Sequence, residues 1–289
     1  MRTFVALALV CLAVSSRIIN KSFVSELKKK ASFEVYDVEE NPFRDWTDEE
    51  IRAMLALVDV KENESIVEKT NDAYDFREDH PECMLGIRNQ LSCGSCWAFS
   101  GVMSMQERFC LKSQGEVKVI LSPQDSVSCD KGNMGCNGGW LAKTWSYYKT
   151  TGLVDDDCFP YSSGEGDVED CITECKNGAP WKKYKISEYS SYGKADKIKK
   201  EITANGPVET GFNVYADFMS YKGGIYVHES GSLQGGHAVV ILGWGTEDGI
   251  DYWICQNSWG EDWGEQGYFR IKMGICAIDA ATYGGVPIL

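Results

Sequence analysis

Residues 90–100 constrain this chain more than any other segment, because they place a reactive thiol where a helix is expected to begin. Cys96 follows a Cys-Gly-Ser turn, and the residues from Trp97 to Met103 continue as an apolar helical pattern. A cysteine at a helix N-terminus lies at the positive end of the dipole and near free backbone N–H groups, which favours the thiolate over the thiol. The sequence therefore predicts a nucleophilic cysteine at the start of a helix.

Residues 1–16 have the composition of a secretory signal peptide. Arg2 supplies a positive start, residues 4–14 are apolar, and residues 13–16 are small enough for cleavage. The apolar run is too short to span a bilayer, and no later stretch is long enough either. Cleavage would remove Cys11 and leave eleven of the twelve cysteines in an oxidising compartment. Because eleven is odd, at least one thiol is expected to stay free, as a nucleophile must.

The composition excludes several classes of function. The chain has 289 residues, enough to bury a substantial core, and its 43% hydrophobic and 12% aromatic content excludes disorder. Its net charge of −14 argues against nucleic acid or an anionic membrane as a partner. The charge fits a protein that works in acid, where many of its 43 acidic residues are neutral, or ordinary acidic solubility. The three histidines lack ligand spacing to any cysteine pair, so no metal or other cofactor is expected.

Residues 17–72 carry charge and no cysteine, and they contain one clear helix signal. Thr47 opens a capping-box pattern, and apolar residues recur at helical spacing from Ile51 to Val58. The pattern predicts an amphipathic helix of about three turns that needs a surface to lie on.

Residues 73–289 change in character near Trp181. Before this point the pattern predicts helices at 96–111 and 141–149, with loops between them. After it, β-branched and aromatic runs separated by glycines predict strands at residues 224–227, 237–242, 251–255 and 267–272. Short strands of this kind suggest a small antiparallel barrel. The sequence therefore predicts an α+β fold with a helical N-terminal half and a β-barrel-like C-terminal half.

Two motifs accompany the Cys96 motif, namely Gly-Gly-His-Ala ending at Ala238 and Gln-Asn-Ser-Trp-Gly ending at Gly260. In this order, the three motifs resemble the papain family of cysteine proteases, and the glycines and cysteines place the chain nearest the cathepsin B branch. The resemblance implies a papain-like two-lobed fold with the active site between the lobes. It makes Cys96 the nucleophile, His237 its imidazole partner and Asn257 the residue that orients the imidazole. Pairing with an imidazolium would lower the pKa of the thiol to roughly 3–4.

The resemblance also assigns residues that bind the substrate. The side chain of Gln90 and the backbone N–H of Cys96 would form an oxyanion hole, although Leu91 stands where the family usually has glycine. Trp259 would shield the histidine–asparagine contact, and Gly138 and Gly139 would line the substrate backbone.

The same resemblance places the S2 pocket, which holds the second residue upstream of the scissile bond. Trp140, Leu141 and Ala238 would form its walls. Ala281 stands where cathepsin B carries an acid that lets it accept arginine. The expected preference is therefore for an apolar or aromatic residue.

The resemblance implies four disulfides: Cys83–Cys110, Cys93–Cys136, Cys129–Cys171 and Cys158–Cys175. Cys96, Cys255 and Cys276 stay outside these pairs. Residues 17–72 would be a propeptide that inhibits the enzyme, leaving residues 73–289 as the peptidase domain. The implied protein is a monomeric zymogen of the secretory pathway, acting in a lysosome or vacuole or outside the cell. Its partners would be protein and peptide substrates, its propeptide and cystatin-type inhibitors.

One departure from cathepsin B concerns the loop after residues 158–161. Cathepsin B has a long insertion there with two histidines that hold a substrate's C-terminal carboxylate, whereas residues 162–170 lead directly to Cys171 without a histidine. The expected activity is therefore that of an endopeptidase. Two other functions stay open: a catalytically idle papain-fold binding protein, and a thiol oxidoreductase in which Cys93 and Cys96 cycle together.

Overall fold

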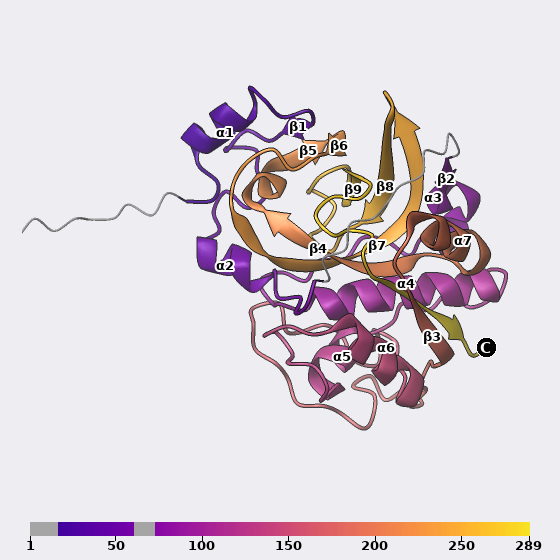
Figure 1. Cartoon of the computed structure of the whole chain (residues 1–289). Coiled ribbons are helices and arrows are strands. Elements are labelled where there is room, and N and C mark those ends of the chain that lie inside the picture. The colour runs from indigo at the N-terminus through magenta and orange to yellow at the C-terminus, as the bar shows by residue number, and fades with distance from the viewer. Residues whose placement is uncertain (1–16, 61–72) are drawn as a thin grey trace, which may run out of the picture.

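The structure, a computed structural model, describes residues 17–60 and 73–289. The predicted signal peptide lies outside these ranges. One long helix, α4 (Cys96–Lys112), runs through the middle of the molecule, with the smaller helices α5 and α6 on one side and the large sheet on the other (Figure 1). This arrangement is the predicted α+β fold with a helical and a β lobe.

The N-terminal segment contributes α1 (Lys21–Leu27), β1 (Glu34–Val35) and α2 (Asp48–Ala53). The capping box at Thr47 forms as predicted, with Glu50 as its second member. The prediction of three helical turns was wrong, however, because α2 ends at Ala53. The following residues 55–58 are extended, since their backbone groups form hydrogen bonds with Gly139 and Gly236 instead of continuing the helix.

The helical lobe is built around α4, whose residues are buried on every side from Cys96 to Cys110. A helix buried all round must lie between other elements, and α4 packs against α5 and α6 as well as β4, β7 and β10. The predicted helices at 96–111 and 141–149 are confirmed within one residue. The helices and 3-10 turns of this part are α3 (Phe76–Asp79), η1 (Pro81–Cys83), α5 (Pro123–Cys129) and α6 (Leu141–Thr150).

The β lobe contains an eight-stranded sheet in which the order is β3-β10-β4-β7-β8-β9-β6, with β2 paired to β7. This order has two free ends, so the sheet is open and does not close into the small antiparallel barrel that the strand pattern suggested. The pair β6 and β9 is also parallel, unlike the others. The remaining elements are β2 (Tyr74–Asp75), β3 (Ile186–Tyr192), α7 (Ala195–Asn205), β4 (Val208–Tyr215), η2 (Ala216–Ser220), β5 (Tyr221–Gly223), β6 (Ile225–Tyr226), β7 (Leu233–Glu247), β8 (Ile250–Gln256), β9 (Tyr268–Lys272) and β10 (Thr282–Pro287).

The described residues form four disulfides, all in the helical lobe, and they are the four pairs that the resemblance implied: Cys83–Cys110, Cys93–Cys136, Cys129–Cys171 and Cys158–Cys175. Cys96, Cys255 and Cys276 are free. Because Cys93 is bonded to Cys136, it does not pair with Cys96, and the structure contradicts the oxidoreductase hypothesis.

Candidate active site

The start of α4 holds Cys96 at the centre of the molecule. Ser95 is the N-cap residue but its side chain makes no capping hydrogen bond, so the first N–H groups of the helix are not capped by this side chain. The backbone N–H groups of Trp97, of Ala238 on β7 and of Ala56 in the N-terminal segment act on the sulfur. Cys96 therefore lies where both lobes and the extended segment meet.

His237 and Asn257 come together from β7 and the end of β8. His237 Nε2 and Asn257 Oδ1 are 2.8 Å apart, and both residues are fully buried. The amide oxygen of Asn257 accepts only, so Nε2 carries the hydrogen and the neutral ring keeps Nδ1 as its acceptor. Nδ1 has no hydrogen-bond partner among the described residues. Trp259 stacks on the imidazole with a centroid distance of 4.6 Å and covers this contact.

In this covered state burial acts against the charged forms of both the thiol and the imidazole. Burial raises the pKa of Cys96 to about 12, although the nearby backbone N–H groups lower it. Burial likewise lowers the pKa of His237 to about 4, against the hydrogen bond to Asn257, which raises it. Desolvation therefore disfavours both charged forms of the expected thiolate–imidazolium pair while the N-terminal segment covers the site.

Gln90 is fully buried, and its side-chain amide is held by hydrogen bonds at both ends. Its Nε2 donates to the carbonyl oxygens of Met54 at 3.0 Å and Cys93 at 2.9 Å. Its Oε1 accepts from the hydroxyl of Ser258 at 2.7 Å. Leu91 has a φ of +55°, the left-handed conformation in which the family's usual glycine carries no strain. The amide of Gln90 is nevertheless held in one orientation.

Residues 55–58 cross the site as an extended strand. Leu57 N–H donates to Gly236 O at 3.0 Å and Val58 N–H donates to Gly139 O at 3.0 Å. Both contacts have parallel strand geometry. A Cβ atom at Gly138 would lie 2.1 Å from the carbonyl oxygen of Ala56, and the φ angle of Gly138 is +110°. Only glycine lets a peptide backbone approach this closely.

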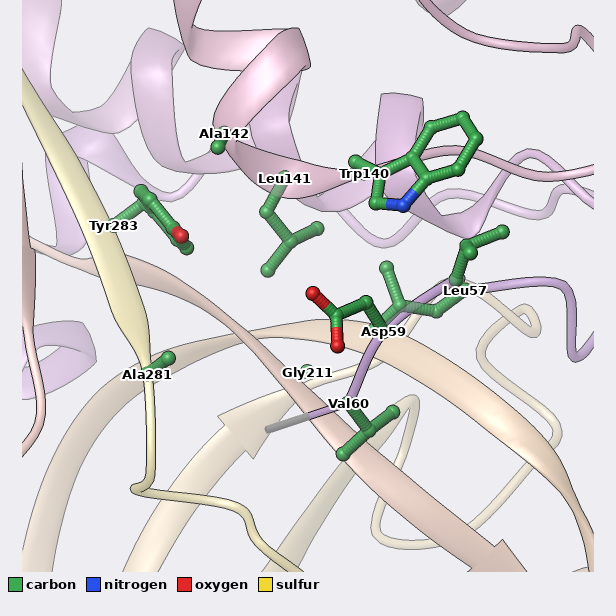
Figure 2. Close-up of a pocket in the computed structure, with 10 residues that line it drawn as sticks. Leu57, Asp59, Val60, Trp140, Leu141, Ala142, Gly211, Ala281 and Tyr283 are labelled. Carbon is green, nitrogen blue, oxygen red and sulfur yellow. The ribbon is translucent and has the colours of Figure 1, made fainter. Parts of the chain in front are cut away.

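A pocket of about 130 Å³ lies beside this strand (Figure 2). Three of the residues expected at S2, Trp140, Leu141 and Ala281, line this pocket. Ala238 does not line it and is buried in the same cluster as Cys96. The sequence prediction missed Gly211 and Tyr283. Tyr283 lies in β10, two residues after Ala281. Because residues two apart in a strand lie on the same face, the position of Ala281 could have predicted that Tyr283 also faces the pocket. From the N-terminal segment, Leu57, Val58, Asp59 and Val60 close the pocket.

The described parts of the chain contain no group of three or more His, Cys, Asp or Glu residues that could hold a metal ion. Among the same residues, no helix has the length and apolar character needed to cross a membrane.

Residues 70–286 match the family of papain family cysteine proteases, and with the free thiol at the start of α4 and the adjacent histidine–asparagine pair they identify the class. The chain belongs to the papain family of cysteine proteases. Within it, the chain is 46% identical over 220 residues to Cathepsin B-like CP3 of Giardia intestinalis, covering 74% of each. It is 40% identical over 253 residues to Cathepsin B-like cysteine proteinase 6 of Caenorhabditis elegans, covering 75% of this chain and 67% of the relative. It is thus a cathepsin B-like member.

The fold is also that of zymogens. The structure of proCathepsin B S9 from Trypanosoma congolense superimposes with a TM-score of 0.85 at 27% identity, covering 94% of this chain and 99% of that chain. Digestive procathepsin L2 from Tenebrio molitor gives a TM-score of 0.75 at 26% identity, covering 93% of this chain and 89% of that chain. Since 94% of the chain is matched, the likeness extends beyond residues 70–286.

Proposed function

We propose that this chain is a cysteine endopeptidase, made as a zymogen, that hydrolyses peptide bonds in proteins by a Cys-His-Asn mechanism. The observation that carries the proposal is the extended segment 55–58, whose main chain pairs with Gly139 and Gly236 beside the free thiol of Cys96. A site that already holds an extended chain against this thiol is suited to hold a peptide substrate.

In the processed enzyme, His237 Nδ1 takes the proton of Cys96 and the thiolate attacks the scissile carbonyl. The Gln90 amide and the backbone N–H of Cys96 stabilise the oxyanion. The imidazolium then donates its proton to the leaving amine, and water hydrolyses the acyl-enzyme to restore the thiol. Asn257 keeps the ring in the tautomer with hydrogen on Nε2.

Residues 17–72 act in this proposal as the propeptide, residues 73–289 as the mature enzyme and residues 1–16 as the signal peptide. The propeptide inhibits because its backbone occupies the groups that a substrate needs. Gln90 donates to the carbonyl of Met54, and the backbone of Ala56 covers Cys96. This supports synthesis as a zymogen. The proposed setting is the secretory pathway, with activity in acid, in a lysosome-like compartment or outside the cell.

The specificity at S2 is proposed to be apolar. Its lining combines Leu141, Gly211, Ala281 and the ring of Tyr283, with no acid except Asp59 of the propeptide itself. A peptide panel should show leucine or phenylalanine preferred over arginine. In Ala281→Glu, arginine should gain on the order of tenfold relative to leucine, because a charge-assisted hydrogen bond becomes possible. Equal rates for arginine and leucine in the wild type would contradict the assignment.

The mature enzyme is proposed to cleave internal bonds. Residues 162–170 contain no histidine to hold a C-terminal carboxylate. Release of dipeptides from a free C-terminus should therefore be much slower than internal cleavage of the same sequence. Comparable rates, measured by mass spectrometry of the products, would refute this part of the proposal.

The central test compares acid-activated wild type with Cys96→Ala. The wild type should hydrolyse a quenched peptide and should bind one equivalent of a thiol-directed epoxide at Cys96. Cys96→Ala should do neither while keeping the fold, as judged by its melting temperature. A wild type that binds peptides but does not cleave them would favour the alternative of a papain-fold binding protein.

A further inference from the structure

Glu209 is a fully buried carboxyl between the two lobes, and the mechanism proposed above does not use it. It lies on β4, and its Oε2 accepts a hydrogen bond of 2.7 Å from Trp145 Nε1 on α6. Its Oε1 lies 2.5 Å from the hydroxyl oxygen of Ser100 on α4. The same hydroxyl lies 2.7 Å from the carbonyl oxygen of Cys96. Glu209 is therefore one hydroxyl group away from the backbone of the nucleophile.

The hydrogens of this chain of contacts can be counted. The hydroxyl of Ser100 has one hydrogen, and the carbonyl of Cys96 can only accept. When Ser100 donates to this carbonyl, the contact of 2.5 Å to Glu209 needs a hydrogen from the carboxyl itself. An ionised carboxylate has none, so it would draw the Ser100 hydrogen to itself and away from the carbonyl. Both contacts are satisfied together only when Glu209 carries a proton.

The surroundings favour this neutral form. Burial raises the pKa of Glu209 to about 8, while the hydrogen bonds from Ser100 and Trp145 lower it, and no nearby cation contributes. The elements packed around it do carry charged groups. Arg108 on α4 donates to the carbonyl oxygens of Gly206 and Pro207 and is paired with Glu201 on α7, and lysines lie on α6 and α7, but none of these charges contributes to the shift in the pKa of Glu209. The thiol of Cys96 on α4 and the phenol of Tyr148 on α6 have pKa values that burial raises, and the imidazole of His237 on β7 has a pKa that burial lowers.

We propose that Glu209 is a positioning residue that works in its protonated form: its carboxyl donates to Ser100, Ser100 donates to the Cys96 carbonyl, and this chain fixes the first turn of α4 against the β lobe. The inference rests on the proposed function, because it concerns how the nucleophile is held. Ionisation of Glu209 breaks the chain and also places a negative charge near Cys96, which opposes formation of the thiolate. Glu209 thereby sets an alkaline limit to activity.

The experiment uses the acid-processed enzyme and measures kcat/KM from pH 4 to 9 for the wild type and Glu209→Gln. The amide can still donate to Ser100 and accept from Trp145, but it cannot ionise. Glu209→Gln should keep acid activity within about threefold, and its alkaline limb should move up by at least about one pH unit. Ser100→Ala should lose on the order of tenfold in kcat at every pH, because a small displacement of a nucleophile is costly.

Glu107→Gln is the matched control. Glu107 lies on α4, the helix that carries Ser100 and Cys96. It is as buried as Glu209 and its pKa is also raised by burial, but its carboxyl oxygens form no hydrogen bond with Ser100 or Cys96. This variant should leave the pH profile of kcat/KM unchanged. The proposal is overturned if Glu209→Gln has the wild-type alkaline limb, or if Glu107→Gln moves this limb equally, since the effect would then be one of general stability.

A second measurement separates this inference from the proposed function. In Cys96→Ala, which cannot hydrolyse peptides, the infrared difference spectrum between Glu209→Gln and its parent at pH 6 should contain a protonated carboxyl band. A carboxylate band instead would overturn the role of Glu209 even if the wild type is an active protease. If the protonated band is present but the wild type hydrolyses no peptide, the proposed function fails while the protonation of Glu209 stands.

Discussion

The side chain of Gln90 has a hydrogen-bond partner for each end of its amide. Ser258 donates to its Oε1, which leaves Nε2 as the end that points its hydrogens at the carbonyls of Met54 and Cys93. The orientation is thus decided by Ser258, a residue of the motif that follows Asn257. In the proposed mechanism, the carbonyl of Met54 occupies the donor that a substrate's developing oxyanion would use, so Gln90 would serve both inhibition and catalysis.

Gln90→Glu should therefore distinguish the role of the donor Nε2 from that of the acceptor Oε1. The carboxylate keeps the size of the side chain and the acceptor for Ser258 but loses the donor. We expect kcat of the processed enzyme to fall by roughly 10²–10³, with a smaller change in KM, because an oxyanion-hole donor acts mainly in the transition state. Steady-state kinetics on a quenched peptide measures this, and an unchanged kcat would exclude Gln90 from the oxyanion hole.

Among the elements, α2 shows how a short helix positions an inhibitor. Its six residues follow Thr47, which forms a complete capping box with Glu50. Thr47 N–H donates to the Glu50 carboxylate at 2.6 Å, and the Thr47 hydroxyl accepts from Glu50 N–H at 3.2 Å. Ile51 and Met54 are buried against the β lobe. The helix fixes the point from which residues 55–58 enter the site.

Thr47→Ala should destabilise α2 and therefore the position of residues 55–58 in the site. Loss of an N-cap costs about 1 kcal/mol, which is roughly a fivefold change in the fraction of open propeptide. We expect acid activation to become about fivefold faster, as followed by the appearance of hydrolysis over time. Lys21→Ala on α1 is the control, because its ion pair with Glu39 is exposed and contributes little. Equal acceleration in both variants would argue against a specific role for the cap.

At the scale of the whole molecule, we expect acid to act on the covered site through His237. Its pKa in this structure is about 4 because of burial, below the ordinary value of 6.5. An uncovered or unfolded histidine takes up a proton between these values, and the covered one does not. The covered state therefore has its full stability above pH 6.5 and loses stability as the pH falls toward 4.

Hydrogen exchange of the amides of Leu57 and Val58 measures this effect, because both donate to backbone carbonyls at the site. In Cys96→Ala, which prevents self-processing, their protection should fall by up to about 100-fold between pH 6.5 and pH 4. His237→Gln should remove most of the fall. Constant protection in the parent, or the same fall in His237→Gln, would show that another group opens the propeptide.

The disulfides stabilise the helical lobe as a whole. Cys129 and Cys171 are 42 residues apart, and closing a loop of this length stabilises the folded state by about 4 kcal/mol in the chain-entropy account. The double variant Cys129→Ser/Cys171→Ser should lower the free energy of unfolding by an amount of this order in denaturant titration. Cys276→Ser, which removes a free thiol, should have a much smaller effect. A similar loss in both would attribute the change to packing instead.

The sequence by itself determined the local features: the helix that begins at Cys96, the helix predicted over residues 141–149, the capping box at Thr47 and four strands of the β lobe. These features follow from neighbours along the chain, and the family motifs added His237, Asn257 and Gln90 through resemblance.

Only the tertiary structure decided where residues 55–58 lie, that the sheet stays open, that Ala238 faces Cys96 instead of the pocket, and that Glu209 meets Ser100. Backbone pairing with Gly139 and Gly236 outweighs the local helical pattern after Ala53. Desolvation, which depends on segments distant in sequence, shifts the pKa values of Cys96, His237 and Glu209. A local sequence pattern cannot predict this backbone pairing or this desolvation, because both arise only when the two lobes and the N-terminal segment pack together.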